Sequence, residues 1–354
     1  MEYSNKLLLK GNEAVVFGAL LAGCDCFFGY PITPASEIAQ TAAEYFPKLG
    51  RPFLQAECET ASINMVLGAS AAGRRVMTAS SGLGISLKQE GVSYIATMEL
   101  PCVIVDIMRG GPGLGNIAPE QSDYNQVVKG GGHGGYKVIV LAPSSAQEMC
   151  DFARLAFELA DKYRIPVYVL TDGVIGQMLE SVALPEPLPR RESPDWALDF
   201  HVNPRTNCLT SIYMEPDDLE ELNHRLNAKY AEIEEKEAHA EEYRTDDAEI
   251  LVAGFGICGR IIRTAIDRLR AGGVKAGMIR PVTLFPFPKK AFTSRLPHAK
   301  QFVSVEMNNG QMIDDIRLTI ECSRPVSLLN RMGGNLPSVE EVVRHCRQLA
   351  QGGQ

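Results

Sequence analysis

The feature that most constrains the fold of this chain is a regular alternation of short apolar runs and helical stretches between residues 5 and about 180. Each apolar run is continuous, which is typical of strands buried on both faces of a parallel sheet. The candidate strands are Cys26–Phe28, Pro52–Gln55, Arg75–Thr78, Pro101–Met108, Lys137–Leu141 and Pro166–Leu170. We therefore expect an α/β fold in which helices cover both faces of a parallel sheet.

The remainder of the chain divides into two further parts. A proline-rich stretch, typical of an extended linker, is followed from residue 216 by a long charged helix. A smaller α/β pattern starts near residue 248 and ends with a helix near 338–350. We expect a first domain over residues 1–183, a linker and connector helix over 184–246, and a second domain over 247–354.

Composition limits the classes of function. The formal net charge is −8 and no basic block occurs, which argues against nucleic acid or an anionic membrane as a partner. Nine cysteines are scattered without a Cys-x-x-Cys pair, so no zinc, iron–sulfur or other metal site is predicted in this chain. Reduced thiols in a cytoplasmic protein are the simplest interpretation.

The first residues resemble a bacterial lipoprotein leader. Lys6 and Lys10 precede the apolar run 14–23, and Cys24 follows a Leu-Ala-Gly triplet. Glu13 beside that run argues against a leader and favours an amphipathic first helix. No run approaches the roughly 18 apolar residues of a membrane span.

The second domain contains a Gly-x-Gly-x-x-Gly turn at residues 254–259, after a strand and before a helix. That is the form of a dinucleotide-binding loop, but the acidic residue expected about 20 positions later is missing. Arg280 stands near that position and suits a 2′-phosphate, which leaves NADP open. A tight glycine turn without a nucleotide is the favoured interpretation.

The stiff turn Gly29–Pro34 (Gly-Tyr-Pro-Ile-Thr-Pro) follows the first apolar run of the sheet. Its two prolines restrict the backbone of their own and the preceding residues. The simple interpretation makes Thr33 the cap of the next helix, with Pro34 in its first turn. The alternative is a ligand-binding turn at the carboxyl end of a strand.

Three further strand ends carry groups suited to a ligand. Glu57 and Glu59 precede a largely apolar helix, where a carboxylate interacts favourably with the helix dipole. The small-residue turn around Ser81 and Gly82 lets a ligand approach the backbone. Arg109 ends the strand that follows. Because parallel strands end at one edge of the sheet, we expect these groups to lie close to Thr33.

These motifs resemble the 2-oxoacid:ferredoxin oxidoreductases, and the Tyr-Pro-Ile-Thr-Pro run is similar to the signature of their α-type subunit. The stretch from Glu59 through Gly68 to Gly84 resembles the pyrimidine-binding half of thiamine diphosphate enzymes. Further similar runs are 86–91, 130–134, 141–145 and 279–288. The resemblance implies a pyrimidine-binding domain followed by a smaller domain like the C-terminal domain of transketolases.

The resemblance also implies roles for individual residues. Glu59, which the interval to Gly68 selects over Glu57, is implied as the catalytic acid–base group at the pyrimidine. Thr33 and Arg109 are implied to bind the substrate carboxylate. The implied cofactor-binding residues are Tyr30, Pro31, Ile32, Glu59, Ser81 and Gly82.

The implied reaction is oxidative decarboxylation of a 2-oxoacid to an acyl-CoA, with coenzyme A as cosubstrate. The resemblance is greatest to subunits acting on 3-methyl-2-oxobutanoate (ketoisovalerate). The alternative substrate is 2-oxoglutarate, and a more distant alternative function is that of a non-redox thiamine diphosphate decarboxylase. Only Asp172-Gly173 approaches the signature that binds the diphosphate through Mg²⁺. The implied partners are therefore a diphosphate-binding subunit, a γ-type subunit, a ferredoxin-like subunit with [4Fe-4S] clusters, and external ferredoxin.

Overall fold

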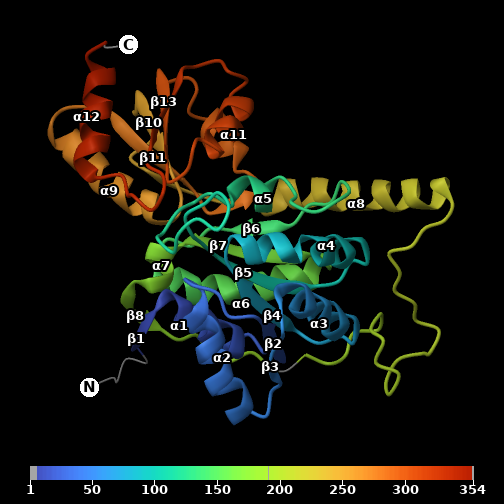
Figure 1. Cartoon of the computed structure of the whole chain (residues 1–354). Helices are drawn as coiled ribbons and strands as arrows, with labels where there is room; N and C mark the ends of the chain where they lie inside the picture. The colour runs from blue at the N-terminus through green and yellow to red at the C-terminus, as the bar shows by residue number, and fades with distance from the viewer. Residues whose placement is uncertain (1–5, 190, 353–354) are drawn as a thin grey trace.

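A computed structural model of the chain describes residues 6–189 and 191–352 (Figure 1). Its larger sheet has seven strands, of which six are parallel and one, β12, is antiparallel to its neighbour β6. In spatial order they are β12 (Thr283–Phe285), β6 (Ile139–Leu141), β7 (Pro166–Asp172), β5 (Cys102–Met108), β4 (Val76–Ser80), β2 (Cys26–Gly29) and β3 (Phe53–Gln55). The parallel α/β sheet expected from the sequence is confirmed.

Helices cover both faces of this sheet. The helices α1 (Gly11–Leu21), α2 (Ser36–Lys48) and α6 (Ala146–Tyr163) lie on one face, and α3 (Glu59–Ala71) and α4 (Leu83–Thr97) lie on the other. Between β5 and β6 a helix was expected near 119–129, but only the short α5 (Tyr124–Val128) forms. The residues before α5 instead form turns and bends, and the Gln121 N–H among them donates to the Met307 carbonyl of the second domain (2.8 Å).

The second sheet has five strands and lies above the first in Figure 1. Its order is β14 (Val326–Asn330), β13 (Gln301–Glu306), β10 (Ile250–Ala253), β11 (Ala276–Pro281) and β9 (Ala240–Tyr243), with β9 antiparallel. Its helices are α9 (Gly256–Ala271), α10 (Lys289–Thr293), α11 (Met312–Thr319) and α12 (Val339–Ala350).

Two strands cross the boundaries expected from the sequence. β9 falls in the range expected as a connector but joins the second sheet, and β12 comes from the second domain but joins the first sheet. The long connector helix α8 (Pro216–Lys236) ends before β9. The structure also contains a two-stranded antiparallel sheet of β1 (Lys6–Lys10) and β8 (Leu179–Ala183), which was not expected from the sequence. Residues 1–5, 190 and 353–354 of the expected ranges lie outside the described residues.

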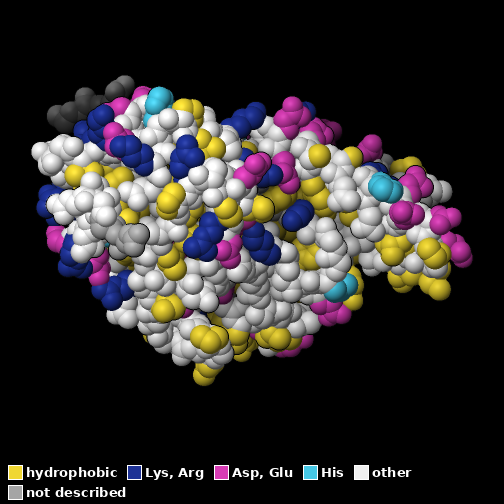
Figure 2. Space-filling model, turned by 90° about the horizontal axis from the view of Figure 1, so that it is seen from above, with side chains coloured by type: hydrophobic (Ala, Val, Ile, Leu, Met, Phe, Trp, Pro, Cys, Tyr) yellow, Lys and Arg dark blue, Asp and Glu magenta, His cyan; other side chains and the backbone are white. Residues whose placement is uncertain are grey.

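The surface seen from above mixes acidic, basic and apolar side chains, without a broad patch of either charge (Figure 2). At its right-hand end, where Figure 1 places the segment before α8, apolar side chains gather beside acidic ones. Exposed side chains of that segment include Phe200, Val202, Ile212 and Met214. No helix in the described part of the chain is long and apolar enough to cross a membrane.

A buried carboxylate joins the two domains at the carboxyl end of β7. Asp172 accepts hydrogen bonds from the backbone N–H of Ile257 (2.9 Å) at the start of α9 and from the Gln121 amide (3.1 Å). Its other oxygen accepts from the N–H of Ile175 (3.2 Å) and caps the short helix α7 (Gly173–Gln177). Since these contacts join β7, the loop before α5 and the second domain, they hold the second domain over the edge of the first sheet.

Replacing Asp172 by Ala is expected to lower the free energy of unfolding by about 3–5 kcal/mol. Three buried N–H donors would lose their acceptor, at about 1–3 kcal/mol each before relaxation. The free energy can be measured by urea denaturation. Asp246→Ala, which removes a carboxylate that is 93% exposed, is the matched control. Equal stability of the two variants would contradict the role of Asp172.

Candidate functional site

The carboxyl ends of β2, β3, β4 and β5 follow one another along one edge of the first sheet. The structure brings two groups of the expected residues into contact there. Thr33, Gly82 and Arg109 form one group, and Glu59 lies beside the Ser80–Gly84 turn in the other. The turn after β4 belongs to both groups, so it links them into one site.

The turn after β2 is fixed by its backbone. The Pro34 carbonyl accepts hydrogen bonds from the side chains of Asn12 (2.7 Å) and Gln177 (3.1 Å). The expectation that Thr33 caps the following helix is wrong, because α2 begins at Ser36 and Ala35 occupies its N-cap position without a side-chain bond. The Ala35 N–H bonds instead to the Ile32 carbonyl (2.9 Å), so a separate turn precedes the helix.

Glu59 occupies the first helical position of α3 and is 5% exposed, whereas Glu57 is exposed. Within the described residues no donor hydrogen-bonds to the Glu59 carboxylate. A Cβ atom at Gly84 would lie 2.8 Å from Glu59 Oε1 and 2.1 Å from Ser80 Oγ. Only glycine at position 84 therefore lets the carboxylate lie against the start of α4.

The turn after β4 carries two buried hydroxyl groups without a partner. Neither Ser80 Oγ nor Ser81 Oγ has a hydrogen-bond partner among the described residues. Gly82 has φ +50°, a backbone conformation that favours glycine. Two unpaired hydroxyls beside an unpaired carboxylate can bind a polar heterocycle, so these residues fit the pyrimidine ring that the sequence resemblance implies.

Arg109 lies at the end of β5 and is 9% exposed. Its guanidinium donates hydrogen bonds to the carbonyls of Thr33 (3.1 Å) and Leu114 (2.9 Å). It also lines a cavity of about 680 Å³ between the two domains, together with the glycine loop 110–113 and Met332. A fork of N–H donors at a cavity wall is suited to a carboxylate ligand.

Two buried carboxyl groups lie beneath this site. Burial raises the pKa of Asp106 well above its usual value, and nearby Asp123 adds to that rise. Burial also raises the pKa of Asp123 to about 6, although Asp123 accepts a hydrogen bond from the Gly82 N–H (3.1 Å). No donor among the described residues reaches the Asp106 carboxyl. Two neighbouring buried carboxyl groups repel each other when both are ionised, so their environment favours a proton on one of the two.

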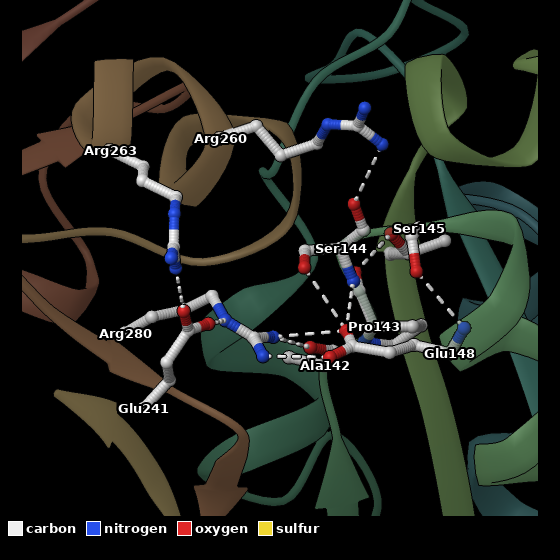
Figure 3. A network of polar contacts seen from close by, with 10 residues as sticks. Ala142, Pro143, Ser144, Ser145, Glu148, Glu241, Arg260, Arg263 and Arg280 are labelled. Atoms are coloured by element: carbon white, nitrogen blue, oxygen red, sulfur yellow. Dashed lines mark hydrogen bonds and ion pairs between the residues drawn. The ribbon is translucent and has the colours of Figure 1, made fainter. Parts of the chain in front are cut away.

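The glycine-rich turn of the second domain is occupied by protein. The Asp172 carboxylate binds the N–H of Ile257, and a Cβ at Gly256 would lie 2.2 Å from it. Figure 3 shows that Arg280 is committed as well: it donates to Glu148 (2.8 and 3.1 Å) and to Glu241 (2.7 Å). These contacts overturn the NADP alternative, because carboxylates already occupy both places that a nucleotide's phosphates would need.

Sequence reasoning missed three buried charged residues of this region: Lys88, Asp106 and Asp123. The sequence offered two signals for them. Asp106 interrupts the apolar run 102–108, and Lys88 lies on an otherwise small and apolar helix face. Each residue is 8% exposed or less, which is unusual for charged side chains. Their partners are distant in sequence, so the signals did not reveal the pairing.

Comparison with known proteins relates both domains to one family. The thiamine diphosphate-binding domain of pyruvate flavodoxin/ferredoxin oxidoreductases matches residues 17–242, and core domain II of pyruvate:ferredoxin oxidoreductase matches residues 248–342. The chain is 57% identical over 344 residues to the ketoisovalerate oxidoreductase subunit VorB of Methanothermobacter thermautotrophicus, covering 97% of each chain. It is 37% identical to the 2-oxoglutarate synthase subunit KorA of Methanocaldococcus jannaschii, covering 95% of this chain and 98% of that one.

Solved structures share the fold. A chain of the 2-oxoglutarate:ferredoxin oxidoreductase from Magnetococcus marinus, solved with 2-oxoglutarate, coenzyme A and succinyl-CoA, matches with a TM-score of 0.88 and 29% identity. The match covers 98% of this chain and 66% of that longer chain. A split-gene transketolase matches with a TM-score of 0.60 at 12% identity, which concerns the fold alone. The transketolase-like architecture expected from the sequence is thereby confirmed.

Replacing Asp106 by Asn is expected to stabilise the protein at pH 8, because burial raises the pKa of the Asp106 carboxyl and Asn removes the cost of keeping this group in its buried site at that pH. A carboxyl whose pKa is raised on folding stabilises the fold at acidic pH. This contribution is lost as the pH rises from the ordinary carboxyl pKa through the raised one, which is about 6 for Asp123. The Asn amide would donate to Asp123 at every pH, so the loss of stability with rising pH should become smaller. Thermal denaturation between pH 5 and 8 measures this, with Asp314→Asn at the surface as control. An unchanged pH dependence would contradict a proton held by one of the two carboxyl groups.

Proposed function

This chain belongs to the 2-oxoacid:ferredoxin oxidoreductase family, and we propose that it is the pyrimidine-binding subunit of a coenzyme A-dependent member. The proposal depends on one observation: Glu59, the Ser80–Gly82 turn and Arg109 lie next to one another at one edge of the sheet. The reaction converts a 2-oxoacid into carbon dioxide and an acyl-CoA, and two electrons pass through iron–sulfur clusters to ferredoxin.

Glu59 exchanges a proton with a ring nitrogen of the cofactor's pyrimidine. Its burial and its lack of a hydrogen-bond donor leave the carboxyl free for that partner. The Ser81 hydroxyl, which has no partner among the described residues, and the Gly82 backbone would hold the ring, and Tyr30, Pro31 and Ile32 would form a further wall of its site. When bound, thiamine diphosphate supplies the nucleophilic carbon and accepts the electron pair released with carbon dioxide.

Arg109 and Thr33 bind the carboxylate of the 2-oxoacid. The Arg109 guanidinium is held by two carbonyls, which fixes its plane before the substrate arrives. The Thr33 side chain is exposed next to it, within 3.4 Å of the Ser36 hydroxyl. Binding and orientation are the contribution of this pair, because the substrate carboxylate leaves as carbon dioxide.

The proposed substrate is a branched-chain 2-oxoacid, 3-methyl-2-oxobutanoate. Sequence identity supports this substrate, because the chain is 57% identical to a ketoisovalerate oxidoreductase subunit but only 37% identical to a 2-oxoglutarate synthase subunit. The cavity at Arg109 supports it too, because its lining has a single basic residue and two carboxyl groups, Glu120 and Asp123. From this chain's side, such a cavity suits one substrate carboxylate better than the two of 2-oxoglutarate.

Partner subunits complete the site. Asp172, which approaches the diphosphate-binding signature, is committed to the domain contact, so we assign the diphosphate and Mg²⁺ to a partner. Exposed apolar side chains around the site, including Tyr30, Leu54, Leu87 and Leu114, are suited to cover by that subunit. The [4Fe-4S] clusters are assigned to a ferredoxin-like subunit that reduces external ferredoxin, with a γ-type subunit completing the complex. All nine cysteines are free thiols, which fits a cytoplasmic complex.

Domain boundaries near 183 and 246 are also part of the proposal. Family matches over residues 17–242 and 248–342 support a second domain that starts after α8. The crossing strands β9 and β12 make the two domains one structural unit around the site.

Replacing Glu59 by Gln is expected to lower 2-oxoacid oxidation by the assembled complex roughly 100-fold or more, because the Gln amide keeps the shape but neither accepts nor releases a proton near neutral pH. Acceptor reduction with 3-methyl-2-oxobutanoate, 2-oxoglutarate and pyruvate measures the loss and the preference. Glu57→Gln, two residues away and exposed, is the matched control with wild-type turnover. Turnover by Glu59→Gln at the wild-type rate would remove the assignment, and a complex without clusters or ferredoxin reduction would favour a non-redox decarboxylase.

Replacing Arg109 by Met is expected to raise the KM for every 2-oxoacid roughly 10- to 100-fold. The reason is the loss of charged hydrogen bonds worth about 1.5–3 kcal/mol to a carboxylate that all substrates share. Steady-state kinetics of the complex measures KM and kcat separately. Arg317→Met on α11 removes an exposed arginine and serves as control. An unchanged KM would exclude Arg109 from substrate binding.

A further inference from the structure

Lys88 on α4 is a lysine with no solvent exposure. Its ammonium donates hydrogen bonds to the hydroxyl groups of Ser62 on α3 and Thr78 on β4 (3.2 Å for Thr78). A buried ammonium costs several kcal/mol unless an anion compensates it, and two hydroxyl groups carry no net charge. A charged neighbour is therefore needed to account for Lys88.

The hydrogen bonds of Lys88 lead directly to the residue at the centre of the site. Ser62 Oγ accepts from Lys88 and donates to the backbone carbonyl of Glu59 (2.8 Å). The ammonium thus lies under the first turn of α3, whose N-terminal end is the positive end of the helix dipole. A cation is unfavourable there unless a carboxylate shares the position.

The Glu59 carboxylate lies on the same side of α4 as Lys88. It lies against Gly84, one helical turn before Lys88, and near Ser80, which follows the Lys88 partner Thr78 by two residues on β4. The ionisable groups that act on Lys88 are Glu59 and Cys58 at the start of α3 and Cys102 on β5; its neighbour on β4, Thr78, is neutral. Burial raises the pKa of the Cys102 thiol to about 12, so this thiol is uncharged at neutral pH. Burial lowers the pKa of Lys88 to about 8, and the charge of Glu59 opposes this fall. Glu59 is therefore the carboxyl group placed to compensate the buried ammonium of Lys88.

We propose that Lys88 is a positioning residue for Glu59: its buried ammonium favours the ionised carboxylate, so that the proton shared with the cofactor's pyrimidine lies on the ring nitrogen. The proposal rests on the function proposed above. No bond other than those to this proton changes, because the proton moves between the Glu59 oxygen and the ring nitrogen while Lys88 keeps its own protons. Lys88 touches neither substrate nor cofactor in this assignment.

Lys88→Gln in the assembled complex tests the proposal, because Gln retains a donor group for Ser62 and Thr78 but loses the charge. Without the cation the neutral form of Glu59 is favoured, so the acid-side inflection of kcat/KM should move up by about one pH unit, a tenfold effect. Deuterium exchange at C2 of bound thiamine diphosphate, which needs neither coenzyme A nor ferredoxin, should slow about tenfold at pH 7.

Lys229→Gln is the matched control, because it removes a lysine that is 15% exposed and pairs with Glu99 (2.5 Å). Its inflection and exchange rate should equal those of the wild type. If Lys88→Gln also leaves both unchanged, even with reduced thermal stability, the proposal is overturned and Lys88 only supports packing. A wild-type complex that binds no thiamine diphosphate would instead contradict the proposed function itself.

Should Lys88→Gln fail to assemble, the double variant Glu59→Gln/Lys88→Gln decides, because it removes both charged groups. Assembly of the double variant would support the charge coupling, because the buried Glu59 carboxylate without its cation would then explain why Lys88→Gln alone does not assemble. Failure of the double variant would overturn the proposal, because Lys88 would be needed whatever the charge at position 59.

Discussion

The arrangement of both domains depends on the buried carboxylate of Asp172. It caps α7 in the first domain and binds the first turn of α9 in the second. Two sequence motifs have the form of ligand sites, Asp172-Gly173 and the glycine turn at 254–259. In the structure they bind each other, through the hydrogen bond from the Ile257 N–H to Asp172. Because this contact lies at the same sheet edge as Glu59 and Arg109, it also holds the second domain as a wall of the cavity.

The site combines a few buried charges, each with a different means of compensation. Glu59 lies on the same side of α4 as the buried ammonium of Lys88, burial and nearby Asp123 raise the pKa of Asp106, and Arg109 is held by backbone carbonyls. Polar groups in a low-dielectric interior act strongly on one another, so small changes in one carboxyl are felt by its neighbours. This explains why the turn at Gly82, which touches both Asp123 and Arg109, is the link between cofactor and substrate positions.

Much of the fold was predictable because it depends on local pattern. Strands such as Pro166–Leu170 are mostly apolar, and their alternation with helices along the chain implies a parallel sheet. The clustering of Glu59 and Arg109 follows from that topology alone. Contacts between distant segments were not predictable: Asp106 and Asp123 are joined only by the fold, and the cap expected at Thr33 failed because a separate turn precedes α2.

The strand β12 has a consequence for the biogenesis of the protein. It pairs with β6 at the outer edge of the first sheet, although the two strands are separated by more than a hundred residues that include α6, β7 and α8. Until residues 283–285 have left the ribosome, β6 therefore keeps an open row of backbone donors and acceptors, the kind of edge that recruits other chains. The second domain therefore closes this edge of the first sheet, which stays open to other chains until residues 283–285 have been made.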